Sequence, residues 1–333
     1  MTAPDRPPTA AELGLMAGFP PPPDKLVTRA NQFHAPFNRW SFQNEEKLNP
    51  GADVWRGDGP VAGFEAAPRD LDALPFETVA GGPSTFGAMI ERSYTDAIAV
   101  VHRGAVIYER YLNGMQPQTR HAWASGSKSV TGTLAALLAA EGLIDPAAPL
   151  AEYVPELAGG GFAGATVRQL MDMTTALAFS DDYGDERADT WRYTVAMGLL
   201  PPPGGYAGPA NIYEFLPTLR QDGAHGERFA YVTPNTDALA WVIRRATGRP
   251  LAELLQERIW EPLGAERDAL WLVDAAGAES AGSGLVSTLR DMARFGQLML
   301  QRGAWRGRRL LPEAAVADIE AGGDREAFAR SAA

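Results

Sequence analysis

Cysteine is absent from this chain of 333 residues, and histidine is scarce. Without cysteine the chain can form neither disulfides nor metal sites with thiolate ligands. Its four histidines are far apart in the sequence, so neither an HxxxH nor an HExxH zinc motif occurs. We therefore expect no metal ion and no cofactor.

Long apolar runs and clusters of positive charge are also missing. No apolar run approaches the roughly 20 residues that span a bilayer, and the N-terminal residues do not follow the pattern of a secretion signal. The net charge of −11 argues against a nucleic-acid partner, because phosphates would be repelled. We expect a cytoplasmic protein with no membrane partner that acts on a small molecule. Assembly into a homodimer is left open.

Lysine is nearly absent as well. It occurs only at positions 25, 47 and 128, so 27 of the 30 basic residues are arginine. Codon bias explains most of this skew. A position that keeps lysine is nevertheless more informative in such a chain, because arginine cannot replace lysine where a proton must be accepted.

The chain divides into segments of different pattern. Residues 1–80 are rich in proline and glycine and predict an extended arm without a core of its own. Two β-branched runs between residues 97 and 111 are typical of a β-hairpin. Residues 143–285 carry helical periodicity, with N-caps expected at Thr166 and Asn211 and a glycine C-cap at Gly248.

These segments predict an α+β fold. An α/β domain of residues 81–142 and 286–333 would be interrupted by a mainly helical domain of residues 143–285. We expect a site where the two domains meet, because clefts form at such boundaries.

The strongest chemical signal is the S-x-x-K motif at Ser125 and Lys128, at the start of an Ala- and Leu-rich helix. Residues three apart share a helix face, so hydroxyl and amine can meet. A desolvated lysine amine can take the proton of a serine, which makes the serine a nucleophile. A chain of this composition is expected to contain about 0.1 such motifs by chance. The alternative is a solvated serine beside a surface lysine.

A second signal lies in the stretch FAYVTPN, directly before an amphipathic helix. Tyr231 could relay protons beside a lysine, and Asn235 could offer its amide to a substrate. The alternative is a core tyrosine followed by an asparagine that only caps the helix.

Four ordered blocks resemble the class C β-lactamase-like, penicillin-recognising serine hydrolases, and among them most closely the 6-aminohexanoate-dimer hydrolases. The blocks are HAWASGSKSVTGTLAALLAAEGLID, ATVRQLMDM, FAYVTPNTDALAWVIRRATG and AGSGLVSTLRDMARFGQLML. The resemblance runs from about residue 38 to the end. It implies an antiparallel sheet flanked by helices and a large helical insertion, a fold shared with DD-peptidases. By the family pattern Ser125 is the nucleophile, Lys128 its base partner, Tyr231 the proton shuttle and Tyr183 a substrate contact.

The chain departs from the family pattern in three places. The usual Thr-Ser-Gly reads Thr-Thr-Ala at residues 174–176, and Gly282 stands where a polar substrate contact is common. The third family motif, Lys-Thr-Gly or His-x-Gly on a late strand, is not found after Tyr231. We therefore expect that C-terminal strands are missing, that a sheet edge beside Ser125 is exposed, and that activity is weak.

These observations predict a serine acyl hydrolase that cleaves a small amide or ester through an acyl-enzyme. The same residues would also serve a carboxylesterase or a β-lactamase. A third interpretation is a catalytically impaired, truncated relative that acts as a binding protein.

Overall fold

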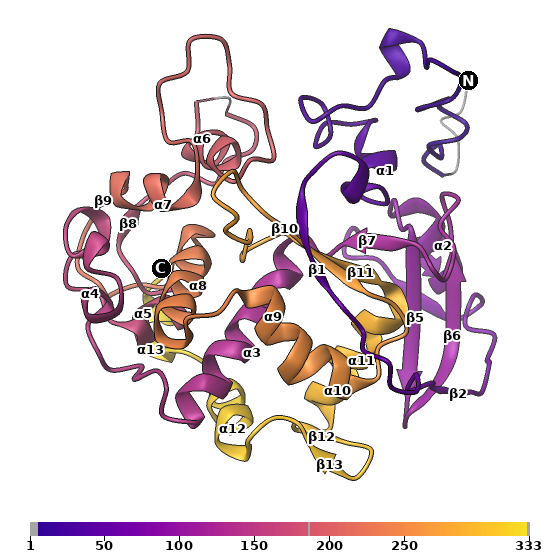
Figure 1. The fold of residues 1–333 in the computed structure, drawn as a ribbon. Coiled ribbons are helices and arrows are strands. Elements are labelled where there is room, and N and C mark those ends of the chain that lie inside the picture. Colours follow the sequence, from indigo (N-terminus) through magenta and orange to yellow (C-terminus); the bar gives the residue numbers. More distant parts are fainter. Residues whose placement is uncertain (1–5, 186, 332–333) are drawn as a thin grey trace.

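The computed structural model describes residues 6–185 and 187–331. Helices and two larger β-sheets enclose one extensive apolar core (Figure 1). The mixture of helices and mainly antiparallel strands confirms the predicted α+β class. None of the described helices has the length and apolarity needed to cross a bilayer.

The N-terminal arm consists of short elements: α1 (Asn38–Ser41), β1 (Gly51–Val54), β2 (Glu65–Ala66), β3 (Pro75–Glu77), β4 (Pro83–Thr85) and α2 (Phe86–Arg92). Contrary to expectation, its first part has a small apolar cluster of its own around Ala10, Leu15 and Val27. Further along, β1 leaves the arm and pairs with a strand more than 200 residues later in the sequence. The pairing of β1 shows that the arm is docked on the rest of the molecule.

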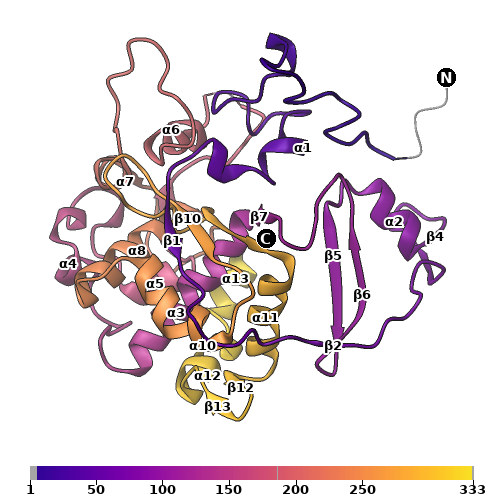
Figure 2. The same cartoon turned by 45° about the vertical axis from the view of Figure 1, so that its right-hand side comes forward.

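The predicted hairpin is confirmed as β5 (Ala97–His102) and β6 (Ala105–Tyr111), which pair antiparallel. β2 adds to β6 in parallel, so the strand order is β2-β6-β5. This sheet lies at one side of the molecule, beside α2 (Figure 2). The edge of β5 that is not paired with β6 faces the rest of the molecule and has no partner among the described strands (Figure 2).

The second larger sheet has the order β1-β10-β11-β7, all antiparallel, with β7 (Arg120–Ala122), β10 (Ala269–Leu272) and β11 (Leu285–Thr288). Every residue of β10 and β11 is buried. Strands buried on both faces lack the alternation of polar and apolar residues by which strands are recognised in a sequence. For this reason the residue pattern does not predict β10 and β11.

The helices that follow β7 and precede β10 in the sequence are α3 (Ser127–Ala140), α4 (Leu150–Tyr153), α5 (Val167–Met171), α6 (Asp189–Ala196), α7 (Ile212–Phe215), α8 (Pro234–Thr247), α9 (Leu251–Leu255) and α10 (Glu261–Leu263). The two-residue strands β8 (Leu177–Ala178) and β9 (Arg220–Gln221) pair among them. Short 3₁₀ turns lie at Pro23–Lys25, Glu45–Lys47, Ala124–Gly126, Pro155–Leu157, Gly160–Phe162 and Leu216–Thr218, and a π turn at Gln256–Trp260.

The predicted helix ends are also confirmed. Thr166 forms a capping box with Gln169, Asn211 caps α7 through its side chain, and α8 ends at Gly248 in the left-handed conformation. Within this group α3 is the central helix, with Val130 and Leu134 almost fully buried.

The chain after β11 forms α11 (Leu289–Leu300), β12 (Ala304–Trp305), β13 (Arg308–Arg309), α12 (Glu313–Ala321) and α13 (Arg325–Ser331). The strands β12 and β13 pair only with each other. Within the described residues, no strand that begins after Thr288 joins either larger sheet. The last three helices expose apolar side chains at Leu300, Ile319 and Phe328.

Candidate active site

Ser125 is placed by a sharp change from strand to helix. β7 pairs with β11, and the backbone N–H of Trp123 extends this pairing with a 2.8 Å hydrogen bond to the Leu285 carbonyl. Ala124 follows with φ of 45°, a left-handed conformation that is unfavourable for a residue with a side chain. The chain then enters α3 through a 3₁₀ turn, and Ser125 remains exposed at the start of the helix.

The side chain of Ser127 stabilises this turn. Its hydroxyl donates to the Ala124 carbonyl at 2.8 Å and accepts the N–H of Leu285 at 3.0 Å. The side chain is fully buried. The two serines of the motif therefore differ in environment, because Ser127 fastens the turn to β11 while Ser125 faces solvent.

Lys128 is the only described residue whose side chain is hydrogen-bonded to the hydroxyl of Ser125. Its Nζ lies 3.0 Å from the Ser125 Oγ and donates to the carbonyl of Gly282 at 2.9 Å. The contact predicted from the spacing of three residues is thus present. These two hydrogen bonds hold the amine in one orientation, although the lysine side chain is long and flexible.

Gly282 can make this contact because it has no side chain. A Cβ added there would lie 2.5 Å from the Thr233 Cγ2, far closer than atoms pack, and 3.6 Å from the Lys128 Nζ. The glycine therefore lets the backbone carbonyl approach Lys128 closely.

Tyr231 lies at the rim of the site. The ring of Tyr231 faces Lys128, whose Nζ is 4.9 Å from the ring centroid in a cation–π contact. Tyr231 is 48% exposed and Tyr183 is 67% exposed. Tyr183 packs edge-on against Trp191, with ring centroids 6.0 Å apart, and burial raises the pKa of its phenol.

The structure does not bring Asn235 to this rim. Its side chain is fully buried, accepts a 2.6 Å hydrogen bond from the Thr175 hydroxyl and donates to the Met173 sulfur at 3.6 Å. Asn235 therefore ties the start of α8 to the Thr-Thr-Ala segment. A substrate could not reach it without displacing Thr175.

A cavity of about 580 Å³ opens beside Lys128 and Tyr231, between α3, α5, α8, α11 and α12. Its lining is largely apolar and includes Leu170, Met171, Met173, Leu239, Met299 and Ile319. Near one end Arg168 pairs with Asp318 at 2.9 Å and with Asp172 at 3.4 Å. Burial raises the pKa of Asp172. The described residues contain no group of three or more His, Asp or Glu side chains arranged to hold a metal ion.

Sequence reasoning missed the loop that leads into β11 and supplies the carbonyl to Lys128. The signal available was the pair of glycines in AGSG, since glycine is typical of close backbone approach. Asp237, beneath this loop, was also missed. An aspartate in the first turn of a helix is common, so the sequence does not indicate that this one is buried.

Comparison with known proteins agrees with this geometry. The family model described as Beta-lactamase matches residues 86–329. The chain belongs to this beta-lactamase family and is a serine hydrolase.

The chain is also similar to three individual proteins. A 6-aminohexanoate-dimer hydrolase from Paenarthrobacter ureafaciens is 41% identical over 294 residues, which is 88% of this chain and 72% of the relative. The structure of a candidate 6-aminohexanoate-dimer hydrolase from Bacillus anthracis has a TM-score of 0.83 at 34% identity and covers 90% of this chain and 78% of its own. A candidate beta-lactamase from Bacteroides dorei, at 21% identity and a TM-score of 0.54 over 69% of this chain and 66% of its own, shares the fold.

Proposed function

We propose that the protein hydrolyses a small amide or ester through a covalent acyl-enzyme on Ser125. The observation that carries this proposal is the 3.0 Å contact between the Ser125 hydroxyl and the Lys128 amine. A serine and a base at hydrogen-bond distance, with the base held by a further group, is the arrangement of an activated nucleophile.

In acylation Lys128 accepts the proton of Ser125 while the serine oxygen attacks the substrate carbonyl. The backbone N–H of Ser125 and the positive end of the α3 dipole face the negative charge that develops on the carbonyl oxygen. The proton then passes by way of the Tyr231 phenol to the leaving amine or alcohol.

Deacylation repeats these steps with water as the nucleophile. Tyr231 and Lys128 take a proton from the water, which attacks the ester carbonyl on Ser125. The proton returns to Ser125 as the acyl group leaves. The steps use only groups of this chain and a water molecule.

The substrate we propose is a short linear amide such as the one that the Paenarthrobacter relative is named for, or an ester of similar size. The cavity beside Lys128 and Tyr231 supports an aliphatic acyl chain, because its lining is largely apolar. The flexible methionine side chains in this lining adapt to chains of different length. We propose Tyr183 as a contact for the remainder of the substrate.

Carboxylesterase and β-lactamase activity use the same residues, so a panel of esters, linear amides and β-lactams would rank the three. A further candidate is ligand binding without turnover. It is favoured by the absence of late strands from the larger sheets among the described residues.

Reaction with a fluorophosphonate separates hydrolase from binding protein, because only an activated serine reacts. We expect intact-mass measurement to show one adduct, which is lost in Ser125→Ala and retained in the control Ser129→Ala. An unlabelled parent protein, or an adduct that persists in Ser125→Ala, would show that the proposal is wrong.

Two expectations from the sequence remain predictions. Cell fractionation tests the cytoplasmic location, and light scattering tests whether two chains associate.

A further inference from the structure

A buried carboxylate lies behind the carbonyl that holds Lys128. We infer that Asp237, together with Tyr193, is a positioning residue that fixes the Gly282 carbonyl and through it the amine of Lys128. This inference rests on the proposed function, since it assigns a role only if Lys128 activates Ser125.

Asp237 lies on α8 and is 1% exposed, so it cannot touch a substrate. Its Oδ1 accepts the backbone N–H of Ala281 at 2.9 Å, and its Oδ2 accepts the hydroxyl of Tyr193 on α6. Ala281 directly precedes Gly282, so the carboxylate sets the orientation of the backbone at the residue whose carbonyl binds Lys128.

The same loop is fastened from the opposite side by α3. The hydroxyl of Thr131 donates to the Ala281 carbonyl at 3.0 Å. Thr131 is three residues after Lys128 and one turn further along the same helix. The N–H of Ala281 is thus held by α8 and its carbonyl by α3. Both peptide units of Ala281 are therefore fixed directly before Gly282, whose carbonyl lies 2.9 Å from the Lys128 Nζ.

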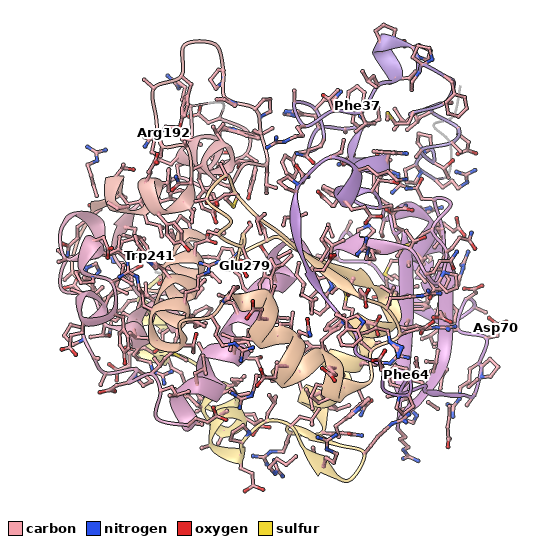
Figure 3. All side chains as sticks on the ribbon, in the orientation of Figure 1. Phe37, Phe64, Asp70, Arg192, Trp241 and Glu279 are labelled. Atoms are coloured by element: carbon pink, nitrogen blue, oxygen red, sulfur yellow. The ribbon has the colours of Figure 1, made fainter. Side chains whose placement is uncertain are left out.

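The charges around Asp237 connect it to the same lysine. Burial raises the pKa of Asp237 to about 6, and hydrogen bonds from Tyr193 and Ala281, then the positive charges of Lys128 and Arg244, act in the opposite direction. Arg244 is already paired with Glu279, which precedes the loop near the middle of the molecule (Figure 3). Lys128 is the other basic residue whose charge acts on Asp237.

A buried group that acts through Lys128 has a distinct kinetic signature. Removing it should slow the chemical step at Ser125 and leave substrate binding nearly unchanged. Its effect should also vanish once Lys128 is gone, because two residues that act as a unit are not additive.

The test compares Asp237→Asn in the parent and in a Lys128→Ala background. Asparagine has the same shape and can still accept from Ala281, but it has no charge and cannot accept from Tyr193. In the parent we expect fluorophosphonate labelling and kcat on a short-chain ester to fall about 10- to 100-fold, the scale of a misplaced catalytic group. KM should change less than about three-fold. In the Lys128→Ala background labelling should slow no further.

Two further variants apply if Asp237→Asn does not fold. Tyr193→Phe and Thr131→Val each remove one hydroxyl of the same support, and each should slow labelling in the parent but not in Lys128→Ala. The matched control is Asp291→Asn, a fully buried carboxylate on α11 that accepts the N–H of Glu266 at 2.7 Å. It should lower the melting temperature without slowing labelling.

Equal slowing with and without Lys128, or unchanged labelling in all three support variants, would overturn the inference. Failure of the proposed function gives a different result, because the parent protein would then be unlabelled, or labelling would survive in Ser125→Ala.

Discussion

The region around Ser125 and the region of the hairpin and arm are held together by different interactions. Around the site, β10 and β11 are buried along their whole length. The α3 side chains Val130, Leu134 and Leu137 are buried in the main apolar core. In the hairpin no residue of β5 is fully buried. Apolar burial therefore fixes the nucleophile, whereas the hairpin contributes less to the core.

The arm and hairpin are joined instead by polar groups around Asp96. This carboxylate accepts hydrogen bonds from Arg39 at 2.8 Å, Asn113 at 3.0 Å, Gln43 at 3.1 Å and His121 at 3.2 Å. Such a network depends on charge and geometry, because removing one partner leaves the others unpaired. Truncating side chains should thus affect the site region most, and changing charges should affect the arm most.

The largest effect is expected on activity rather than stability. Tyr231 is half-exposed at the rim, so Tyr231→Phe removes the proposed proton relay without disturbing the core. We expect kcat to fall about 10²- to 10⁴-fold, the range for general acid–base groups, with little change in KM or melting temperature. Steady-state kinetics with a short-chain ester provide the measurement. A near-normal kcat would make Tyr231 a packing residue only.

A matched pair of truncations measures the contrast in burial directly. Leu134→Ala in α3 should lower the free energy of unfolding by about 2–5 kcal/mol, because it leaves a cavity in a closed core. Ile98→Ala in β5 removes a side chain of equal carbon number from a half-buried position and should cost about 1 kcal/mol. Urea denaturation gives both values, and similar losses in the two variants would contradict the comparison.

A further effect on stability is expected in the arm and depends on pH. Burial raises the pKa of Glu45 to about 7, while Asn49 and His121 act in the opposite direction and Glu46 adds to the rise. Since the unfolded chain keeps a pKa near 4.5, folding favours the protonated carboxyl. The resulting stability is present below about pH 4.5 and is lost as pH rises through 7.

Glu45→Gln copies the protonated form at every pH. We expect it to be more stable than the parent by about 1–3 kcal/mol at pH 8, and nearly equal at pH 4.5. Urea titrations of both proteins at the two pH values give the difference. A difference that does not change with pH would mean that Glu45 stays ionised in the folded protein.

The sequence predicted those parts of the fold that leave a local pattern. The hairpin, the N-caps Thr166 and Asn211 and the end of α8 at Gly248 were found because alternation, capping residues and glycine are local signals. The strands β10 and β11 were not found, because ALWL and LVST are buried on both faces and carry no alternation. The apolar cluster within the arm was missed because its members are scattered along a proline-rich segment.

The contacts of the site also divide into those that local spacing predicts and those that depend on the tertiary structure. The contact of Ser125 with Lys128 follows from helix spacing alone, and the structure contains it. The burial of Asn235 beside Thr175 depends on how α8 meets a segment 60 residues earlier in the chain. The same holds for the link from Asp237 through Ala281 to Lys128, which joins three distant segments. Such contacts require the tertiary structure.

The central claim is that Lys128 activates Ser125 by accepting its proton, and Lys128→Arg tests this most directly. Arginine keeps the positive charge but does not give up its proton in proteins. We predict that the rate of fluorophosphonate labelling of Ser125 falls in Lys128→Arg nearly as far as in Lys128→Ala. A Lys128→Arg variant that is labelled at close to the parental rate would contradict the account, because it would show that Lys128 contributes only its charge.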